Sequence, residues 1–160
     1  MTQAVVAGSL VVAALNVLSG LLGAWLWYRG DPADPGERIA RAQRAFWLML
    51  RVGQGSALAL ALAVGSLAAA GHYSSTRLFY LYALLPLAIA FLAEQLRATS
   101  AQTVLDQRGL ADAEAVGSLP ADEQRTFVAT VLRREMGVMA ASAIVVAFLA
   151  LRAAGTAHGF

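Results

Sequence analysis

Four long stretches of this chain carry almost no charge, and together they take up about half of its 160 residues. They run from about Ala4 to Tyr28, Val52 to Gly71, Leu78 to Leu96 and Met136 to Leu151. An α-helix rises about 1.5 Å per residue, so about 20 apolar residues cross a hydrocarbon core about 30 Å thick. The stretches therefore predict an all-α, polytopic membrane protein with four transmembrane helices in an antiparallel bundle.

The composition agrees with a membrane protein of one domain. Hydrophobic residues make up 59% of the chain and charged residues 14%, and the mean hydropathy is +0.62, whereas soluble domains carry about 25% charged residues. Four spans of about 20 residues leave room only for ends and loops. We therefore expect residues 1–160 to form a single four-helix transmembrane domain.

The arginines predict how the chain is threaded. All 12 basic residues are Arg, which indicates a GC-rich coding sequence and hence a prokaryote. Ten of them lie in segments 29–51 and 97–135, and the other two are Arg77 and Arg152. The positive-inside rule counts Lys and Arg in short loops beside the spans. We therefore expect a multi-pass protein of the cytoplasmic (inner) membrane, with both loops cytoplasmic and both termini outside.

Segment 97–135 is the one substantial part predicted outside the membrane. Ala98 to Gln107 can continue the third helix, and Arg108-Gly109 supplies a stop. Ser118-Leu119-Pro120 followed by acids is typical of a helix start, so the fourth helix should begin near Pro120 and run about 35 residues. The third and fourth helices thus extend into the cytoplasm as a helical hairpin. The fourth helix has an apolar face in this hairpin, which can pack on the extension of the third helix or on a partner protein. The face consists of Phe127, Val128, Val131 and Leu132.

The second helix is expected to begin in the cytoplasm. Gly30 to Gly36 is rich in turn-forming residues, and Glu37 favours a new helix N-terminus. Arg38, Arg41 and Arg44 then recur every three residues, so they stay close to one helix face. They can contact anionic lipid headgroups, or alternatively bind an anionic ligand.

Small residues mark a predicted helix contact. The second span carries five of them at unbroken i+4 spacing: Gly53, Ala57, Ala61, Gly65 and Ala69. Because lipid is as apolar as Leu, close packing of small residues drives helix association in membranes. We expect the second helix at the centre of the bundle, with this face against the first or fourth helix; the alternative is a face for self-association.

Four residues are candidates for a site inside the bilayer. Asn16 lies near the midplane of the first span, and Arg51, Gln54 and Glu94 fall at similar depth near the cytoplasmic side. Polar groups in a membrane are costly and usually face the bundle interior. Arg51 and Glu94 can form an interhelical ion pair that fixes helix register, or the group can form a substrate, lipid or proton site.

The residue types present exclude several kinds of catalytic and cofactor site. Cysteine and lysine are absent, and the two histidines, His72 and His158, both fall on the outer side. No bis-histidine haem, Schiff base or Ser-His dyad can therefore form inside the membrane. We expect no catalytic residue, no metal, no cofactor and no nucleic-acid partner.

One short segment resembles a known family. Residues 37–45, read as Glu-Arg-Ile-Ala-Arg-Ala-Gln-Arg-Ala, are similar to the Arg-rich start of a helix in the membrane-associated eicosanoid and glutathione metabolism proteins, which are also small four-span proteins. The family continues with Asn and then Glu, which support a thiol-peptide site. Here Phe46, Trp47, Leu48 and Met49 follow. The resemblance implies a four-span membrane enzyme.

Three functions follow from these patterns. The first is an accessory or scaffold subunit without catalytic groups, which packs against other membrane subunits or copies of itself and against lipid. The second is a small transporter, channel or lipid-binding protein that uses Asn16, Gln54 and Glu94 as its polar lining and Pro86 as a bend. The third is the membrane enzyme that the resemblance implies.

Overall fold

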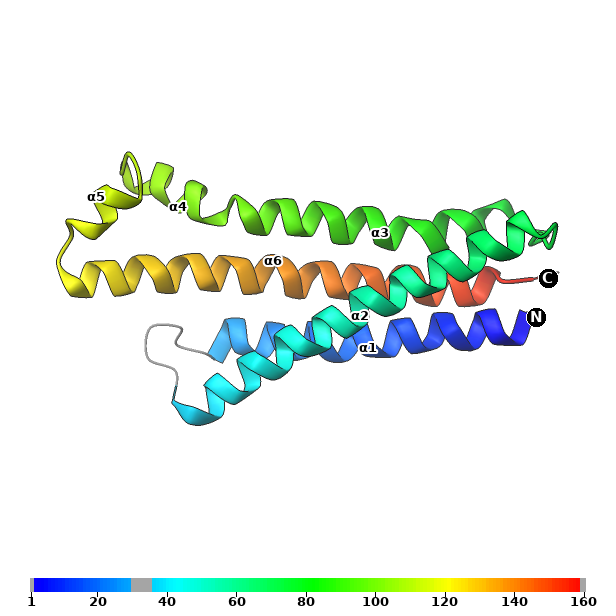
Figure 1. Cartoon of the computed structure of the whole chain (residues 1–160). Coiled ribbons are helices and arrows are strands. Elements are labelled where there is room, and N and C mark those ends of the chain that lie inside the picture. The colour runs from blue at the N-terminus through cyan, green and yellow to red at the C-terminus, as the bar shows by residue number, and fades with distance from the viewer. Residues whose placement is uncertain (1, 30–35, 159–160) are drawn as a thin grey trace.

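The computed structural model describes residues 2–29 and 36–158, and every regular element within them is a helix. In chain order these are α1 (Thr2–Arg29), α2 (Glu37–Ala69), α3 (Arg77–Ala98), α4 (Ser100–Arg108), α5 (Ala113–Gly117) and α6 (Ala121–Thr156). By length and composition α1, α2, α3 and α6 can each cross a membrane, which confirms the all-α class and the presence of four helices long and apolar enough to be spans. Consecutive long helices run in opposite directions (Figure 1).

The central helix is α6, and the expectation that the second helix lies at the centre is wrong. Half of the most apolar window of α6 is buried, against 22% for α2. Helix α6 lies between α1 and α3, whereas α2 crosses α1 obliquely (Figure 1). The reason is that α6 buries small side chains at three- and four-residue spacing. Among them are Ala140, Ala143, Ala147 and Ala150, so two neighbours can approach α6 at once.

Glycines bring α1 against α6. A Cβ on Gly20 would lie 2.7 Å from the Ile144 side chain, and one on Gly23 would lie 2.8 Å from the Cβ of Ala140 and 2.5 Å from the Phe46 ring. Real Cβ atoms essentially never come so close to another heavy atom. Only glycine, which has no Cβ, therefore permits the observed spacing of α1 and α6 at these two positions.

The start of α2 and the length of α6 agree with the sequence. Helix α2 begins at Glu37, and α6 runs 36 residues from Ala121, directly after Pro120. Gly109 ends α4 with a φ of 65°, a left-handed conformation that Gly adopts without strain. The predicted break at 30–35 lies outside the described residues. Pro86 is buried inside α3.

The third helix does not continue unbroken to Gln107 as predicted. Helix α3 ends at Ala98, and α4 begins after Thr99. The Thr99 hydroxyl donates to the carbonyls of Gln95 and Leu96, and the Ser100 hydroxyl donates to the carbonyl of Leu96 at 3.0 Å. Such hydroxyls compete with backbone N–H groups for the carbonyls of a helix and often bend it.

Helix α4 packs on the first turns of α6. Val104, Leu105 and Phe127 are buried together, and Val131 packs against them. Val128 and Leu132, which the sequence placed on the same apolar face, are exposed. The hairpin therefore buries half of that face within the chain. It also contains α5, which the sequence analysis missed; the Asp112 carboxylate caps it by accepting from the backbone N–H of Ala115 at 2.9 Å.

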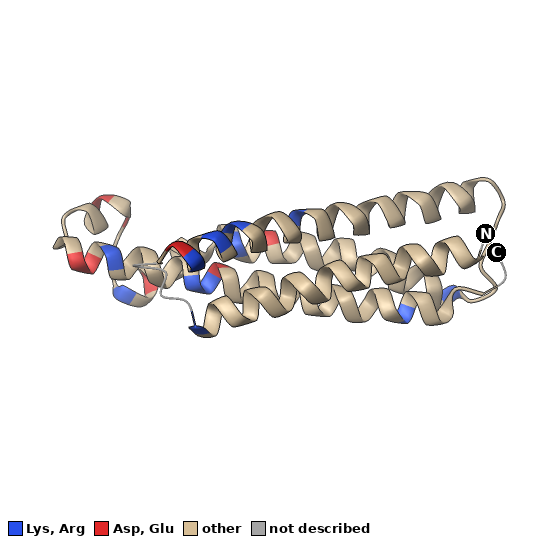
Figure 2. Cartoon of the chain, turned by 90° about the horizontal axis from the view of Figure 1, so that it is seen from below, with Lys and Arg blue, Asp and Glu red and all other residues tan. Residues whose placement is uncertain are grey.

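Charged residues gather at the end of the bundle opposite the two termini (Figure 2); we call this the charged end. The other end is closed by hydrogen bonds. The carbonyl of His158 accepts from the Ser74 hydroxyl at 3.0 Å, the Ser75 hydroxyl at 3.1 Å and the Ser75 backbone N–H at 3.0 Å. The segment after α6 is thus attached to the α2–α3 loop as far as His158.

Substitution of Gly23 by Ala should destabilise the bundle by about 1–3 kcal/mol, because a methyl group there overpacks the contact with Phe46 and Ala140. Gly55→Ala is the matched control, since no atom lies within 4 Å of its added Cβ. Helix propensity alone favours Ala by about 0.5–1 kcal/mol, so this control should be neutral or stabilising. Thermal unfolding in detergent measures both. Equal stability of the two variants would contradict the close α1–α6 contact.

Candidate functional site

Three helices bring five polar side chains together at the charged end. Helix α2 supplies Arg51 and Gln54, α3 supplies Glu94 and Arg97, and α6 supplies Glu135. Each pair on one helix is three residues apart, so its members share a face. We call these five residues the polar cluster.

The Glu94 carboxylate is the centre of the polar cluster. Its Oε1 accepts from Nη1 of Arg51 at 2.5 Å and from Nε2 of Gln54 at 3.2 Å. Its Oε2 accepts from Nε of Arg97 at 2.9 Å. Arg51 also donates to Oε1 of Gln54 at 2.7 Å. This carboxylate joins α2 to α3 through two donors of α2, and the third donor lies on its own helix.

Arg97 extends the polar cluster to α6. Its Nη1 lies 3.8 Å from Oε2 of Glu135, and its guanidinium carbon lies 5.7 Å from the centre of the Trp47 ring. Two arginines and two glutamates are present, so the formal charges cancel. The Glu135 side chain is 20% exposed and the Arg51 side chain 50%. The polar cluster therefore lies at the edge of the bundle rather than in a sealed interior.

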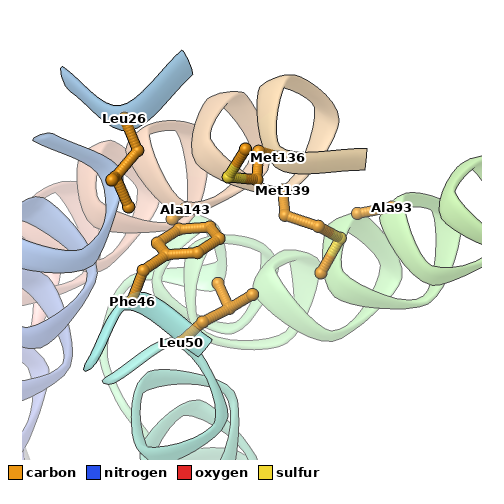
Figure 3. Close-up of a cluster of buried hydrophobic side chains, with 7 residues drawn as sticks. All are labelled: Leu26, Phe46, Leu50, Ala93, Met136, Met139 and Ala143. Carbon is orange, nitrogen blue, oxygen red and sulfur yellow. The ribbon is translucent and has the colours of Figure 1, made fainter. Parts of the chain in front are cut away.

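An apolar core lies directly beside the polar cluster. Leu50, Ala93 and Met136 are buried, and each is the chain neighbour of a charged member of the cluster. In Figure 3 they converge with Leu26, Phe46, Met139 and Ala143. On each of the three helices a buried core residue and a charged residue are adjacent in the chain. Packing and ion pairing therefore hold the same contact from two sides.

Asn16 lies apart from these groups, in the contact between α1 and α2. Its side chain is 1% exposed, and Nδ2 donates to the carbonyls of Val12 at 2.9 Å and Gly53 at 3.4 Å. A Cβ on Gly53 would lie 3.1 Å from the Asn16 amide, so Gly53 permits this approach. The structure thus joins Arg51, Gln54 and Glu94 but gives Asn16 a different set of contacts.

The predicted packing residues of α2 divide into two groups. Gly53, Ala57 and Ala61 are buried, and Ala57 packs with Val12 of α1. Gly65 and Ala69 are exposed, and no atom lies within 4 Å of a Cβ built on Gly65. The expectation of a close contact at Gly65 within the chain is therefore wrong. Val64, the residue before Gly65, is buried with Val5 and Phe79, so Gly65 is exposed because it faces away from the other helices of the chain.

The three arginines Arg38, Arg41 and Arg44 are exposed on α2. Arg41 pairs with Glu37, with Nη2 and Oε2 3.6 Å apart. Their predicted contact with lipid headgroups stays a prediction. Phe46, where the resembling family has Asn, is fully buried in the core, so this turn of α2 brings no polar group into the bundle at that position.

Sequence analysis missed Arg97, Glu135 and Trp47 as members or neighbours of the polar cluster. The i, i+3 spacing of Glu94 and Arg97 was a usable signal. The ion pair between Arg97 and Glu135 had no such signal, because it depends on how α6 lies beside α3. Within the described residues no group of three or more His, Asp or Glu could hold a metal ion.

Comparison of the chain with protein-family models, with curated proteins and with solved structures finds no match.

Removal of Glu94 should leave Arg51 without an acidic partner near the membrane, and removal of Arg51 should leave Glu94 with Arg97 as its one ion-pair partner in the described residues. Arg51→Gln and Glu94→Gln should each destabilise the protein more than the double variant does. The coupling, which is the difference between the double effect and the sum of the single effects, should be about 0.5–3 kcal/mol. A double-mutant cycle on detergent-solubilised protein measures this coupling.

The pair Asp122 and Arg125 is the control for this cycle. It lies on the exposed face of α6, 3.9 Å apart, with side chains 96% and 74% exposed, and should show no measurable coupling. Additive effects at Arg51 and Glu94 would contradict a structural ion pair there.

Proposed function

We propose that this protein is an accessory or scaffold subunit of the membrane, whose α2 packs against a helix of another subunit or of a second copy. The proposal is carried by the second half of the small-residue stripe, Gly65 and Ala69, which is exposed on the surface of the single chain. Gly and Ala gain little from contact with lipid, but they let another helix backbone approach closely. The first half of the same stripe makes such contacts with α1.

The exposure of α2 supports the proposal. Only 22% of its most apolar window is buried within the chain. Leu58 and Leu62 are exposed beside the stripe. A second helix laid along Gly65 and Ala69 would bury these two side chains and approach the backbone at Gly65.

The polar cluster also supports a structural role. Both carboxylates have arginine partners, and the Gln54 amide is used on both its oxygen and its nitrogen. Such a group fixes the register of α2, α3 and α6 at one end. The membrane-enzyme alternative has less support, since Phe46 occupies the core where the resembling family places a polar side chain.

The alternative function is a small transporter, channel or lipid-binding protein. It would use the polar cluster as a site open to one side of the membrane. The burial of Asn16 and its bonds to backbone carbonyls favour packing over a polar lining. If Glu94 binds substrate or protons, its replacement should abolish transport while leaving the fold intact, and Arg51 need not couple to it.

The proposal includes a location, the inner membrane of a prokaryote. Helix α6 and the α4–α5 segment would extend into the cytoplasm, because the charged end contains ten of the twelve arginines. Both termini would lie outside, beside Arg77 and Arg152.

A photo-reactive group on α2 tests the packing surface. The chain has no Cys, so Gly65→Cys can carry a benzophenone at one defined position. Irradiation of native membranes should give a protein adduct of discrete mass, at twice the chain mass for a homodimer. Ala88→Cys, on the exposed face of α3, is the control and should give lipid adducts. Lipid adducts alone at both positions would contradict the proposal.

Accessible cysteines test the threading. In intact cells an impermeant thiol reagent should label Tyr73→Cys, which replaces a side chain 64% exposed in the α2–α3 loop. Ser118→Cys, at the end of α5, should react only after the membrane is permeabilised. Ser74 is not suitable because it is buried and hydrogen-bonded. Labelling of Ser118→Cys from outside would reverse the proposed orientation.

A further inference from the structure

A groove of about 480 Å³ runs between α1 and α6 at the charged end. Its apolar lining includes Ala24, Gly137, Ala141 and Ile144, and its remaining lining includes Trp27 and Arg134. The groove exists because Gly137 and Ala141, one turn apart on α6, have almost no side chain. Ala141 is exposed, so this space is open at the surface of the chain.

Arg134 lies one turn before Gly137, toward the charged end, and shares a helix face with Val138 and Ala141. Within residues 2–29 and 36–158 its guanidinium has neither an ion pair nor a hydrogen bond. The next residue, Glu135, is turned to the other side of α6 and pairs with Arg97. The groove therefore ends at a positive charge that no residue in the described part of the chain neutralises.

Trp27 forms the opposite wall near that charge. The Arg133 guanidinium carbon lies 5.6 Å from the centre of the Trp27 ring, a cation–π contact that holds the indole in place. The indole edge faces α6, since a Cβ on Gly137 would lie 3.0 Å from Nε1 of Trp27. The described part of the chain offers this N–H no acceptor. A donor and a cation thus lie beside one another at the headgroup end of an apolar groove.

Only an amphiphile matches both the apolar lining of the groove and its polar end at Arg134 and Trp27. A free anion would use Arg134 but gain nothing from the apolar lining, and a neutral hydrocarbon would leave the cation unmatched. A basic pocket between membrane helices on the side with most Arg is a recognised place for acidic lipid headgroups. The second apolar groove, between α1 and α2, has about 450 Å³ but no charged residue in its lining, so it lacks this match.

We propose that the α1–α6 groove binds one acidic phospholipid, with an acyl chain along Gly137, Ala141 and Ile144 and the phosphate at Arg134 and the Trp27 N–H. The site is independent of any partner on α2, because its lining residues come from α1 and α6 alone. It also differs from the exposed arginines Arg38, Arg41 and Arg44, none of which lines this groove.

Native mass spectrometry of the purified protein with phosphatidylglycerol or phosphatidylcholine tests the site. The unaltered chain should retain one phosphatidylglycerol in preference to phosphatidylcholine. Arg134→Gln removes the charge and should weaken retention about fivefold. Ala141→Leu fills the groove at an exposed position and should weaken it comparably without overpacking the bundle. Arg134→Lys, which keeps the charge, should restore most of the preference.

Arg125→Gln is the control, because it removes an equally exposed arginine of α6 outside the groove. It should leave retention unchanged, and helix content by circular dichroism should be equal in all variants. Equal retention of both lipids, or equal loss in the Arg125 variant, would overturn the proposal. Loss with Arg134→Gln but not with Ala141→Leu would also overturn it, since the groove would then take no part. If the Arg134→Gln variant does not fold, lipid retention by the Ala141→Leu and Arg134→Lys variants tests the proposal.

Discussion

Close approach of α1 to α6 is the interaction on which the rest of this bundle depends. In a hydrocarbon solvent apolar side chains gain little by exchanging lipid for one another, so helices associate where backbones can come near enough for dense van der Waals contact. Gly20 and Gly23 of α1 meet Ala140 and Ile144 of α6 in this way. With that pair in place, α6 has its other side free for α3, and α2 is left to cross α1 from outside.

The two ends of the bundle are closed by different means. At the charged end Glu94 and Arg97 connect three helices, and the buried neighbours Leu50, Ala93 and Met136 pack beside them. At the opposite end uncharged groups suffice, since Ser74 and Ser75 bind the carbonyl of His158. This asymmetry follows the charged residues, because ten of the twelve arginines lie at the charged end and only Arg77 and Arg152 at the other.

The same small residues that allow packing also leave surfaces open. On α2 Gly65 and Ala69 face away from the other helices of the chain and stay exposed, which suits another helix. On α6 Gly137 and Ala141 leave a groove that ends at Arg134, which suits an amphiphile with an acidic headgroup. The difference between these two surfaces is charge: an uncharged stripe favours a protein helix, whereas a cation at the end of an apolar groove favours a lipid.

The sequence by itself determined the elements of this protein. Four uncharged stretches predicted four long helices, Glu37 and Pro120 marked helix starts, and Gly109 marked a stop, because hydropathy and local backbone chemistry act over a few neighbouring residues. Glu94 and Arg51 could be paired from their depth alone. Only the tertiary structure decided that α6 is central, that Gly65 is exposed and that Glu135 joins the polar cluster. These features depend on rotation and crossing of whole helices. Regular spacing of small residues shows which face of a helix can pack closely, but the helix that meets this face, and how far along, is set by the shapes of all four helices together.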